Sequence, residues 1–193
     1  MKINDPFHHP FNEREATQIA CRIVAAYGKE INFYRLVKLL YIVEREFWTQ
    51  LEQPAMGGAY FSMKDGPMIS ETSDAAKPAN AAKFPIWAAH LKQTPYEDGR
   101  GNKITLLKDA GRDDISDALL EITDRVIATT KSWNNRILKA HCHSFKEYKE
   151  PPPGRTVPIQ AGAILMAEGK SPTEIEKLQA ESNLWKGVDA VLA

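Results

Sequence analysis

The chain has 193 residues, of which 43% are hydrophobic, and its 25 basic residues balance 25 acidic ones. This length suits one domain, and the hydrophobic content is sufficient for a buried core, which excludes general disorder. No apolar run approaches the roughly 20 residues of a membrane span, the N-terminus lacks a secretory signal, and two cysteines are too few for a disulfide framework. We therefore expect a soluble cytoplasmic protein with no excess of positive charge for nucleic acid.

The first quarter of the chain predicts two helices. Asn12 and Glu15 have the spacing of a capping box, and the helix that follows ends at Gly28. Asn32 opens a longer helix to about Leu51, which carries two apolar stripes. These are Leu36, Leu39, Leu40, Val43 and Phe47, and Phe33, Val37, Tyr41 and Trp48. A helix that is apolar on two sides packs between neighbours, so we expect this one to be central.

Residues 57–107 predict short strands and turns. The first strand is expected over residues 57–63, and a Lys64-Asp65-Gly66-Pro67 turn follows, in which Pro67 can also begin a helix. Residues 73–84 predict a loop, and residues 86–91 predict a second strand. Residues 98–102 predict a turn before a third strand over residues 104–107. Strands this short indicate a small antiparallel sheet laid on helices.

The remaining sequence predicts four helices. We expect them over residues 113–126, over residues 133–145, over residues 158–166, and from a capping box at Ser171 onward. The last helix has apolar residues at Ile175, Leu178, Trp185 and Val188. The expected fold class is α+β and predominantly helical: a compact helical domain with a small antiparallel sheet of short strands. It forms one domain over residues 1–193, with residues 1–11 and the last residues flexible.

Patterns that carry chemistry are scarce. His141 and His143 lie two positions apart on a predicted helix and point to different sides, so we expect a structural role and no shared metal. The Glu44-Arg45-Glu46 run is interpreted as a solvated helix edge. The helices around Gly169 could form a helix-turn-helix, but the second is acidic, which disfavours DNA. An enzyme that uses His143 or His141 and a DNA-binding autorepressor are kept as alternatives.

Two motifs resemble the SocA-like antitoxin family, also called Panacea or phage-associated GepA-like. One is Lys38-Leu-Leu-Tyr41 on the central helix, and the other is Tyr60-Phe-Ser-Met-Lys-Asp-Gly-Pro-Met-Ile-Ser70. Residues 104–107, 113–126 and 143–148 are similar to the later pattern of the family. The resemblance extends from about residue 12 to about residue 180. It implies the antitoxin of a bacterial or phage toxin–antitoxin system, which neutralises a cognate protein toxin by direct binding, without catalytic residues, metal or cofactor.

One branch of the family implies an alternative, a proteolytic adaptor that delivers the toxin to an AAA+ protease. For partner binding we expect a surface that combines the segment after the central helix with the basic helix near residue 140. Its residues are Tyr60, Lys64, Gly66, Pro67, Lys139, His143 and Tyr148. Residues 131–155 carry six basic residues against two acidic ones, which suits an acidic partner. The competing interpretation makes Gly66-Pro67 a turn needed for backbone shape, and makes Tyr60 and Tyr148 core residues with a wet hydroxyl.

Overall fold

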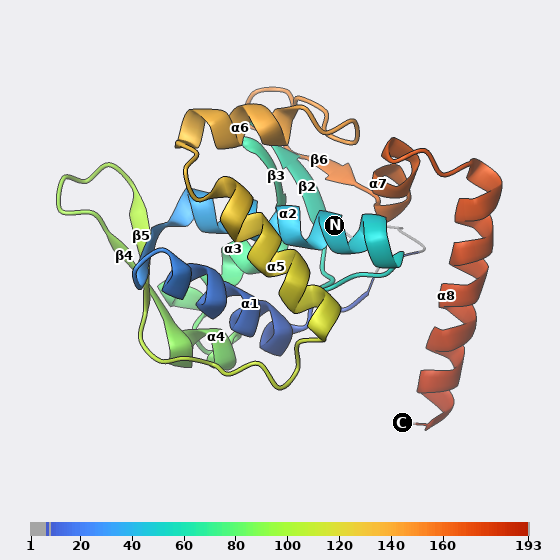
Figure 1. Cartoon of the computed structure of the whole chain (residues 1–193), viewed down its shortest axis with the longest axis horizontal. Coiled ribbons are helices and arrows are strands. Elements are labelled where there is room, and N and C mark those ends of the chain that lie inside the picture. Colours follow the sequence, from blue (N-terminus) through green and yellow to red (C-terminus); the bar gives the residue numbers. More distant parts are fainter. Residues whose placement is uncertain (1–6, 8, 193) are drawn as a thin grey trace.

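Helix α2 (Phe33–Leu51) runs through the centre of the molecule (Figure 1). The computed structural model describes residue 7 and residues 9–192, with side chains up to residue 182. Every residue from Arg35 to Arg45 is buried, so the two apolar stripes predicted the position of the helix correctly. The same stretch buries four charged residues, which therefore need partners inside the protein.

The main helices that pack on α2 are α1 (Glu13–Ala26), α5 (Asp117–Thr130), α6 (Asn135–His143) and α7 (Ala161–Ala167). The predicted capping box before α1 is confirmed. The Asn12 side chain accepts a hydrogen bond from the backbone N–H of Glu15 (3.3 Å) and donates one to its carboxylate (2.7 Å). Asn32 caps α2 by accepting from the backbone N–H of Arg35 (3.2 Å), also as predicted.

The strands form two small antiparallel sheets. One has the order β1 (Glu30–Asn32), β5 (Asn102–Leu106), β4 (Leu91–Pro95). The other has the order β3 (Gly66–Ile69), β2 (Tyr60–Met63), β6 (Val157–Ile159) and brings together strands almost one hundred positions apart in the chain. The predicted α+β, mostly helical class is confirmed. Strands β1 and β6 were not predicted, because three residues carry too little alternation to be recognised. Strand β3 was not predicted either, since Pro67 was expected in a turn or at the start of a helix, and β4 begins where the predicted second strand ends.

Two predictions between residues 70 and 91 are wrong. The expected loop contains the end of α3 (Ser70–Ala75) and a 3₁₀ turn, η1 (Pro78–Asn80), and the expected second strand is helix α4 (Pro85–His90). Pro85 occupies the first turn of α4, where its missing N–H carries no penalty. The backbone N–H of Trp87 donates to the Glu13 carboxylate (2.8 Å), and the Trp87 ring is buried. Contacts with α1 thus outweigh the local strand pattern.

Two further boundaries differ from the predictions. Helix α5 begins after Ser116 instead of at Asp113, because the Gln18 side chain holds Asp114 through its backbone N–H (3.1 Å) and its carboxylate (2.9 Å). The segment predicted as one helix over residues 158–166 divides into β6 and α7. The first residues of that segment form a strand because they pair with β2, where Pro158 lies opposite Phe61.

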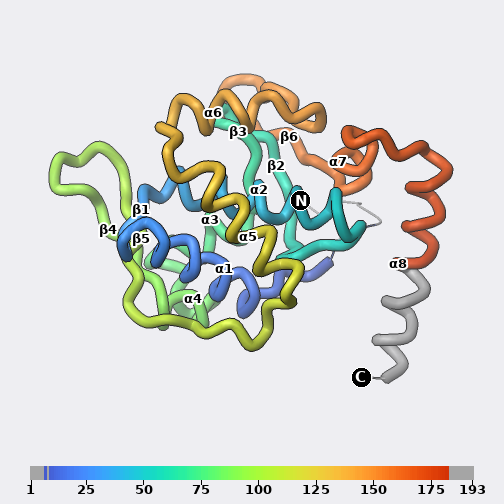
Figure 2. Tube along the Cα trace, viewed as in Figure 1, coloured from blue at the N-terminus to red at the C-terminus, as the bar shows by residue number. Residues whose placement is uncertain are grey.

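The last helix, α8 (Pro172–Leu192), begins with the predicted capping box between Ser171 and Glu174. It follows α7 at one side of the molecule (Figure 2). Ile175 is buried and Leu178 packs against the core, whereas Trp185 and Val188 lie outside the described side chains. The flexibility expected at the two ends of the chain concerns, in part, residues outside the described range. No helix in the described part of the chain is both long and apolar enough to cross a membrane.

Candidate partner-binding surface

A buried lysine of α2 holds the turn between β2 and β3. Lys38 is 2% exposed, and its ammonium group donates to the backbone carbonyl oxygens of Gly66 (2.6 Å) and Pro67 (2.9 Å). Burial lowers the pKa of Lys38 to about 8. The two motifs that carry the family resemblance are therefore one structural unit, in which the helix supplies the donor and the turn supplies two acceptors.

Gly66 lets this turn sit directly on α6. Its φ of +100° lies in the region that favours glycine, and an added Cβ would lie 3.0 Å from the Cβ of Cys142. The turn is also fixed from outside, because the Lys139 ammonium group of α6 pairs with the Asp65 carboxylate (2.6 Å). The hydroxyl group of Tyr34 donates to the Asp65 carbonyl oxygen (3.1 Å). Helices α2 and α6 thus determine the position of the turn from two sides.

The segment after α6 completes the same surface. The Tyr148 hydroxyl group donates to the Glu150 carboxylate (2.6 Å) and also reaches the Met63 carbonyl oxygen (3.1 Å). The His143 ring lies 4.4 Å from the Tyr148 ring. Burial lowers the pKa of His143, whose Nε2 has no hydrogen-bond partner among the described residues. We use the name "turn surface" for the side chains that lie together here and are at least partly exposed. They are Lys64, Asp65, Lys139, His143 and Tyr148.

Of the seven predicted partner-binding residues, the structure buries three. Gly66 and Pro67 are the first residues of β3, directly after the Lys64-Asp65 turn, and Tyr60 is 4% exposed. The Tyr60 hydroxyl group accepts a hydrogen bond from Trp48 Nε1 (2.9 Å) and donates one to the Glu44 carboxylate (2.5 Å). Tyr60 is therefore a core residue, but its hydroxyl group bonds to protein groups and not to water, contrary to the core interpretation. These three residues shape the surface from beneath, and Lys64, Lys139, His143 and Tyr148 lie on it.

The interpretation of Glu44 and Arg45 as a solvated edge is wrong. The Glu44 side chain is fully buried and accepts hydrogen bonds from the backbone N–H groups of Met56 (2.6 Å) and Gly57 (3.3 Å), which fixes the chain just before β2. Burial raises the pKa of Glu44 to about 7, although the hydrogen bonds from Tyr60 and from the backbone act in the opposite direction. The sequence did contain a signal for this burial, because a charged residue on a helix that is apolar on two sides has little exposed surface to occupy.

Arg45 organises a second buried network. Its guanidinium group pairs with the carboxylates of Glu147 (2.7 Å) and Glu168 (2.5 Å), and it stacks over the Phe145 ring at 4.4 Å. The Tyr41 hydroxyl group also donates to Glu147 (3.3 Å). This network ties the segment after α6, which carries Tyr148, to the central helix.

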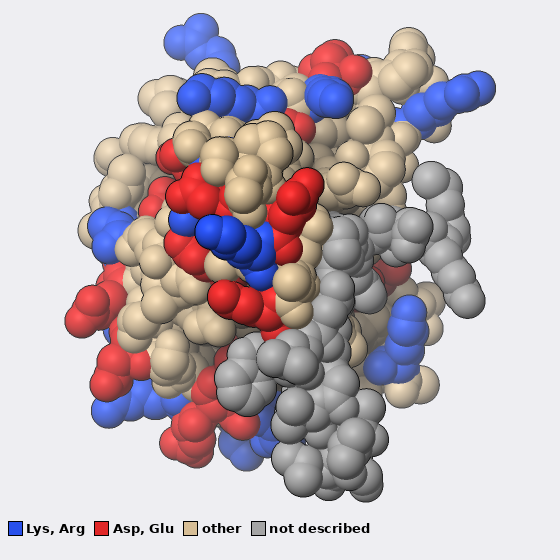
Figure 3. All heavy atoms as spheres, turned by 90° about the vertical axis from the view of Figure 1, so that its right-hand side faces the viewer, with Lys and Arg blue, Asp and Glu red and all other residues tan. Residues whose placement is uncertain are grey.

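The turn surface and its surroundings are positively charged, because one of the two acidic residues of the segment 131–155 is internal. Glu147 is buried in an ion pair with Arg45, so Glu150 is the one acidic residue of this segment that is exposed. The side chains of Lys131, Arg136, Lys149 and Arg155 form no ion pair with the described residues. By contrast, acidic and basic side chains are mixed on the face near α7 (Figure 3), where Lys170 pairs with Glu52 and Arg125 with Glu46.

Sequence reasoning missed an apolar patch beside this surface. Phe61, Met63 and Met68 point to the face of the β3-β2-β6 sheet opposite α2 and are only partly buried. They line a pocket of about 280 Å³, together with residues of α3, Lys77 and Thr156. The signal was present in the sequence, since Tyr60-Phe61-Ser62-Met63 places apolar side chains on both faces of the strand, whereas a half-solvated strand has a polar outer face.

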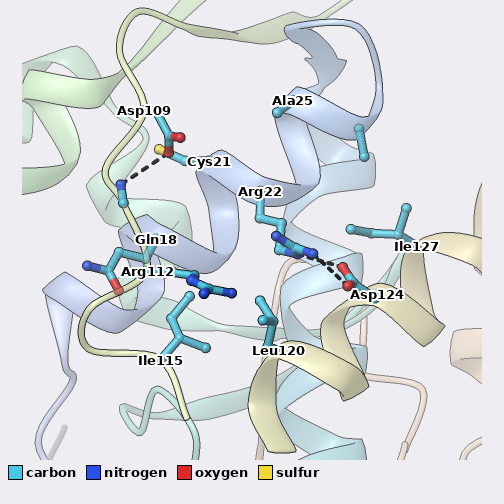
Figure 4. A pocket seen from close by; sticks show the side chains of 12 residues that line it. Gln18, Cys21, Arg22, Ala25, Asp109, Arg112, Ile115, Leu120, Asp124 and Ile127 are labelled. Atoms are coloured by element: carbon cyan, nitrogen blue, oxygen red, sulfur yellow. Dashed lines mark hydrogen bonds and ion pairs between the residues drawn. The ribbon is translucent and has the colours of Figure 1, made fainter. Parts of the chain in front are cut away.

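A separate pocket of about 380 Å³ lies between α1, α5 and the loop before α5 (Figure 4). The Arg22 side chain reaches from α1 to α5 and pairs with Asp124 through two hydrogen bonds of 2.5 Å and 2.6 Å. Cys21 also lines this pocket, but burial raises its pKa to about 12. It is therefore protonated at neutral pH and lacks the thiolate character of a nucleophile.

The His141-Cys142-His143 run has no shared site. As predicted, the two histidines point to different sides: His141 lies between the rings of Trp133 and Phe145, at 4.9 Å from each, whereas His143 stacks on Tyr148. Burial raises the pKa of Cys142 to about 12. Within the described part of the chain, no group of three or more His, Cys, Asp or Glu residues could hold a metal ion.

Comparison with known proteins identifies one family. The model of the antitoxin SocA-like, Panacea domain matches residues 36–149, which is more than half of the chain. No curated protein and no solved structure gives a significant match. The matched residues extend from the first turn of α2 to the residue after Tyr148, and therefore include both Lys38 and the entire turn surface.

Proposed function

Since the chain belongs to the SocA-like, Panacea antitoxin family, we propose that it neutralises a cognate protein toxin by forming a stable complex with it through the turn surface. The observation that carries this proposal is the contact of Lys38 with Gly66 and Pro67. This contact joins the two motifs that resemble the family into one hydrogen-bonded unit. That unit presents exposed charged and aromatic side chains at the surface, which suits recognition of a partner.

The proposal includes a role without catalysis. Both cysteines are held as thiols, and the histidines of α6 are packed against aromatic rings. The enzyme alternative depends on His143, whose Nε2 is buried and has no hydrogen-bond partner among the described residues. Because His143 also lies on the turn surface, a folded His143→Ala protein should at most bind the toxin more weakly, and it should still neutralise the toxin when present in excess. Loss of rescue by a correctly folded His143→Ala protein that still binds the toxin would favour catalysis instead.

Coexpression with the product of the adjacent gene tests the function directly. That product should arrest growth alone, and growth should return when this chain is present. If the neighbour is not toxic, or remains equally toxic, the antitoxin proposal fails. Rescue that disappears in a host without its AAA+ proteases would indicate a proteolytic adaptor. Salt-dependent binding of the chain to its own promoter would indicate an autorepressor, which predicts stronger binding at low salt.

Charge reversals test the turn surface within the same complex. Lys64→Glu and Lys139→Glu should leave the overall fold intact, because exposed charges contribute little to stability, although Lys139→Glu also removes the ion pair that holds Asp65. Both should slow association with an acidic partner surface and make the association rate less sensitive to salt. Lys92→Glu, at an exposed position of β4, is the matched control. Unchanged affinity and association rate for both reversals at low salt would place the interface elsewhere.

A further inference from the structure

We propose that the outer face of the β3-β2-β6 sheet is the apolar centre of the toxin interface, and that it accepts an amphipathic helix of the toxin with acidic flanks. This inference rests on the proposed function and deepens it. Its starting point is the pocket formed by Phe61, Met63 and Met68, which none of the buried networks described above uses.

The register of the sheet places these side chains together. Phe61 lies opposite Met68 on β3 and opposite Pro158 on β6, so it is the centre of the outer face. Tyr60 and Ser62 alternate with it and are buried toward α2, which leaves the outer residues partly exposed. Methionine side chains adapt their shape to a partner, and an aromatic ring buries a large area with few rotatable bonds. Both are properties of interface centres.

The edges of the sheet favour insertion of side chains over addition of a strand. Sheet order makes β6 an edge strand, and Pro158 at its middle position has no N–H to donate to a new strand. On the other side, β3 is in contact with α6. A partner that cannot extend the sheet can still place one apolar face into the pocket, as an amphipathic helix does in a groove.

The charges at the rim of the pocket indicate which residues should flank the apolar face of the toxin helix. Lys64 follows Met63, and Arg155 precedes Thr156, which lines the pocket; neither side chain forms an ion pair with the described residues. The third basic residue, Lys77, pairs with Asp74 (2.6 Å), which is the acidic residue of the lining. The pocket therefore has an excess of positive charge at its rim, and carboxylates beside the apolar face of the partner complement it.

The pocket is also continuous with the turn surface. Met63 precedes Lys64 in the chain, and its carbonyl oxygen lies 3.1 Å from the Tyr148 hydroxyl group. A partner helix that fills the pocket would consequently lie beside the side chains that the proposed function assigns to the toxin. One interface would then combine an apolar centre with a charged rim, which is the usual anatomy of a specific complex.

The test compares matched substitutions in the full-length chain. Phe61→Ser and Met68→Ser should each weaken binding of the toxin from the adjacent gene by about tenfold or more, measured by titration calorimetry. Met166→Ser is the control, because Met166 is 55% exposed on α7 and does not line the pocket. Arg155→Glu is a second probe that spares the sheet, and it should reduce affinity mainly at low salt. Unfolding curves confirm that each variant is folded.

The outcomes separate this inference from the proposed function. If the wild-type chain does not neutralise the toxin, both fall together. If the wild-type chain neutralises it, while folded Phe61→Ser and Met68→Ser bind as tightly as Met166→Ser, only the apolar centre is refuted. Sedimentation of the chain without the toxin tests whether a second copy of the chain covers this face. A dimer that dissociates with Phe61→Ser would show that a second copy covers this face, and would overturn the assignment to a toxin helix.

Discussion

The buried carboxylate of Glu44 should make the protein less stable as the pH rises from 4.5 to 7. Burial raises its pKa from 4.5 to about 7 in the folded state, so between these values the folded protein holds a proton that the unfolded chain has lost. A shift of this size corresponds to about 3 kcal/mol of unfolding free energy, since one pKa unit is worth about 1.4 kcal/mol. The contribution is complete below pH 4.5 and is lost as the pH passes through 7.

Glu44→Gln removes the ionisation and keeps the shape of the side chain. The difference in unfolding free energy, wild type minus variant, should therefore fall by about 3 kcal/mol between pH 4 and pH 8. Urea unfolding of both proteins at intervals across this range measures it, and the subtraction cancels the titration of all other groups. A difference that rises with pH would refute the reasoning. It would mean that the donors of Met56, Gly57 and Tyr60 stabilise the carboxylate more than burial penalises it.

Three further changes test the architecture, each by urea unfolding at pH 7. Lys38→Met leaves the carbonyl oxygens of Gly66 and Pro67 without their donor and should lower the unfolding free energy by about 1–3 kcal/mol. The loss is not larger because the variant no longer buries a charge. An unchanged value would show that the turn does not depend on Lys38. Glu147→Gln leaves Arg45 with only Glu168 as a counterion and should lower it by about 3 kcal/mol, whereas a gain in stability would contradict a net role for the pair. Leu40→Ala, at a side chain with no exposed surface, should lower it by about 2–5 kcal/mol, and a change below about 1 kcal/mol would mean that this side of α2 is not the core.

The sequence predicted the helical framework because its signals are local. The capping residues Asn12, Asn32 and Ser171 all act within three positions, and the stripes of α2 lie within one element. The turn at Lys64-Asp65 and the loop between β4 and β5 were likewise predicted from residues that favour turns, although Gly66 and Pro67 belong to β3. These features need no knowledge of distant parts of the chain.

The errors occurred where distant residues decide the local structure. Residues 86–91 have the composition of a strand, yet they form a helix because Glu13 and the core beside α1 take up Trp87. The start of α5 depends on Gln18, about one hundred positions earlier in the chain. Strand β6 exists only because β2 offers it a partner. None of these partners can be read from a sequence window, so the predictions there followed propensity alone.

The candidate surface was predicted in part for the same reason. Its location near the turn and α6 was inferred from motif residues, but the motif does not distinguish residues that support a surface from residues that form it. Tyr60, Gly66 and Pro67 are support, and the outer face of β2 was overlooked. Burial is a property of the folded chain, and it was the information needed to separate the two groups.

This separation has a consequence for specificity. Lys38, Glu44 and Arg45 are committed to internal partners, and replacing any of them would leave a buried group unpaired. The outward side chains of β2 and the turn, such as Phe61 and Lys64, can be replaced without leaving a buried polar group unpaired. A scaffold whose charged residues are used internally to fix a turn can therefore exchange its exposed residues without losing the backbone that presents them. Under the proposed function, the fold would determine where the toxin binds, and the outward side chains would determine which toxin it is.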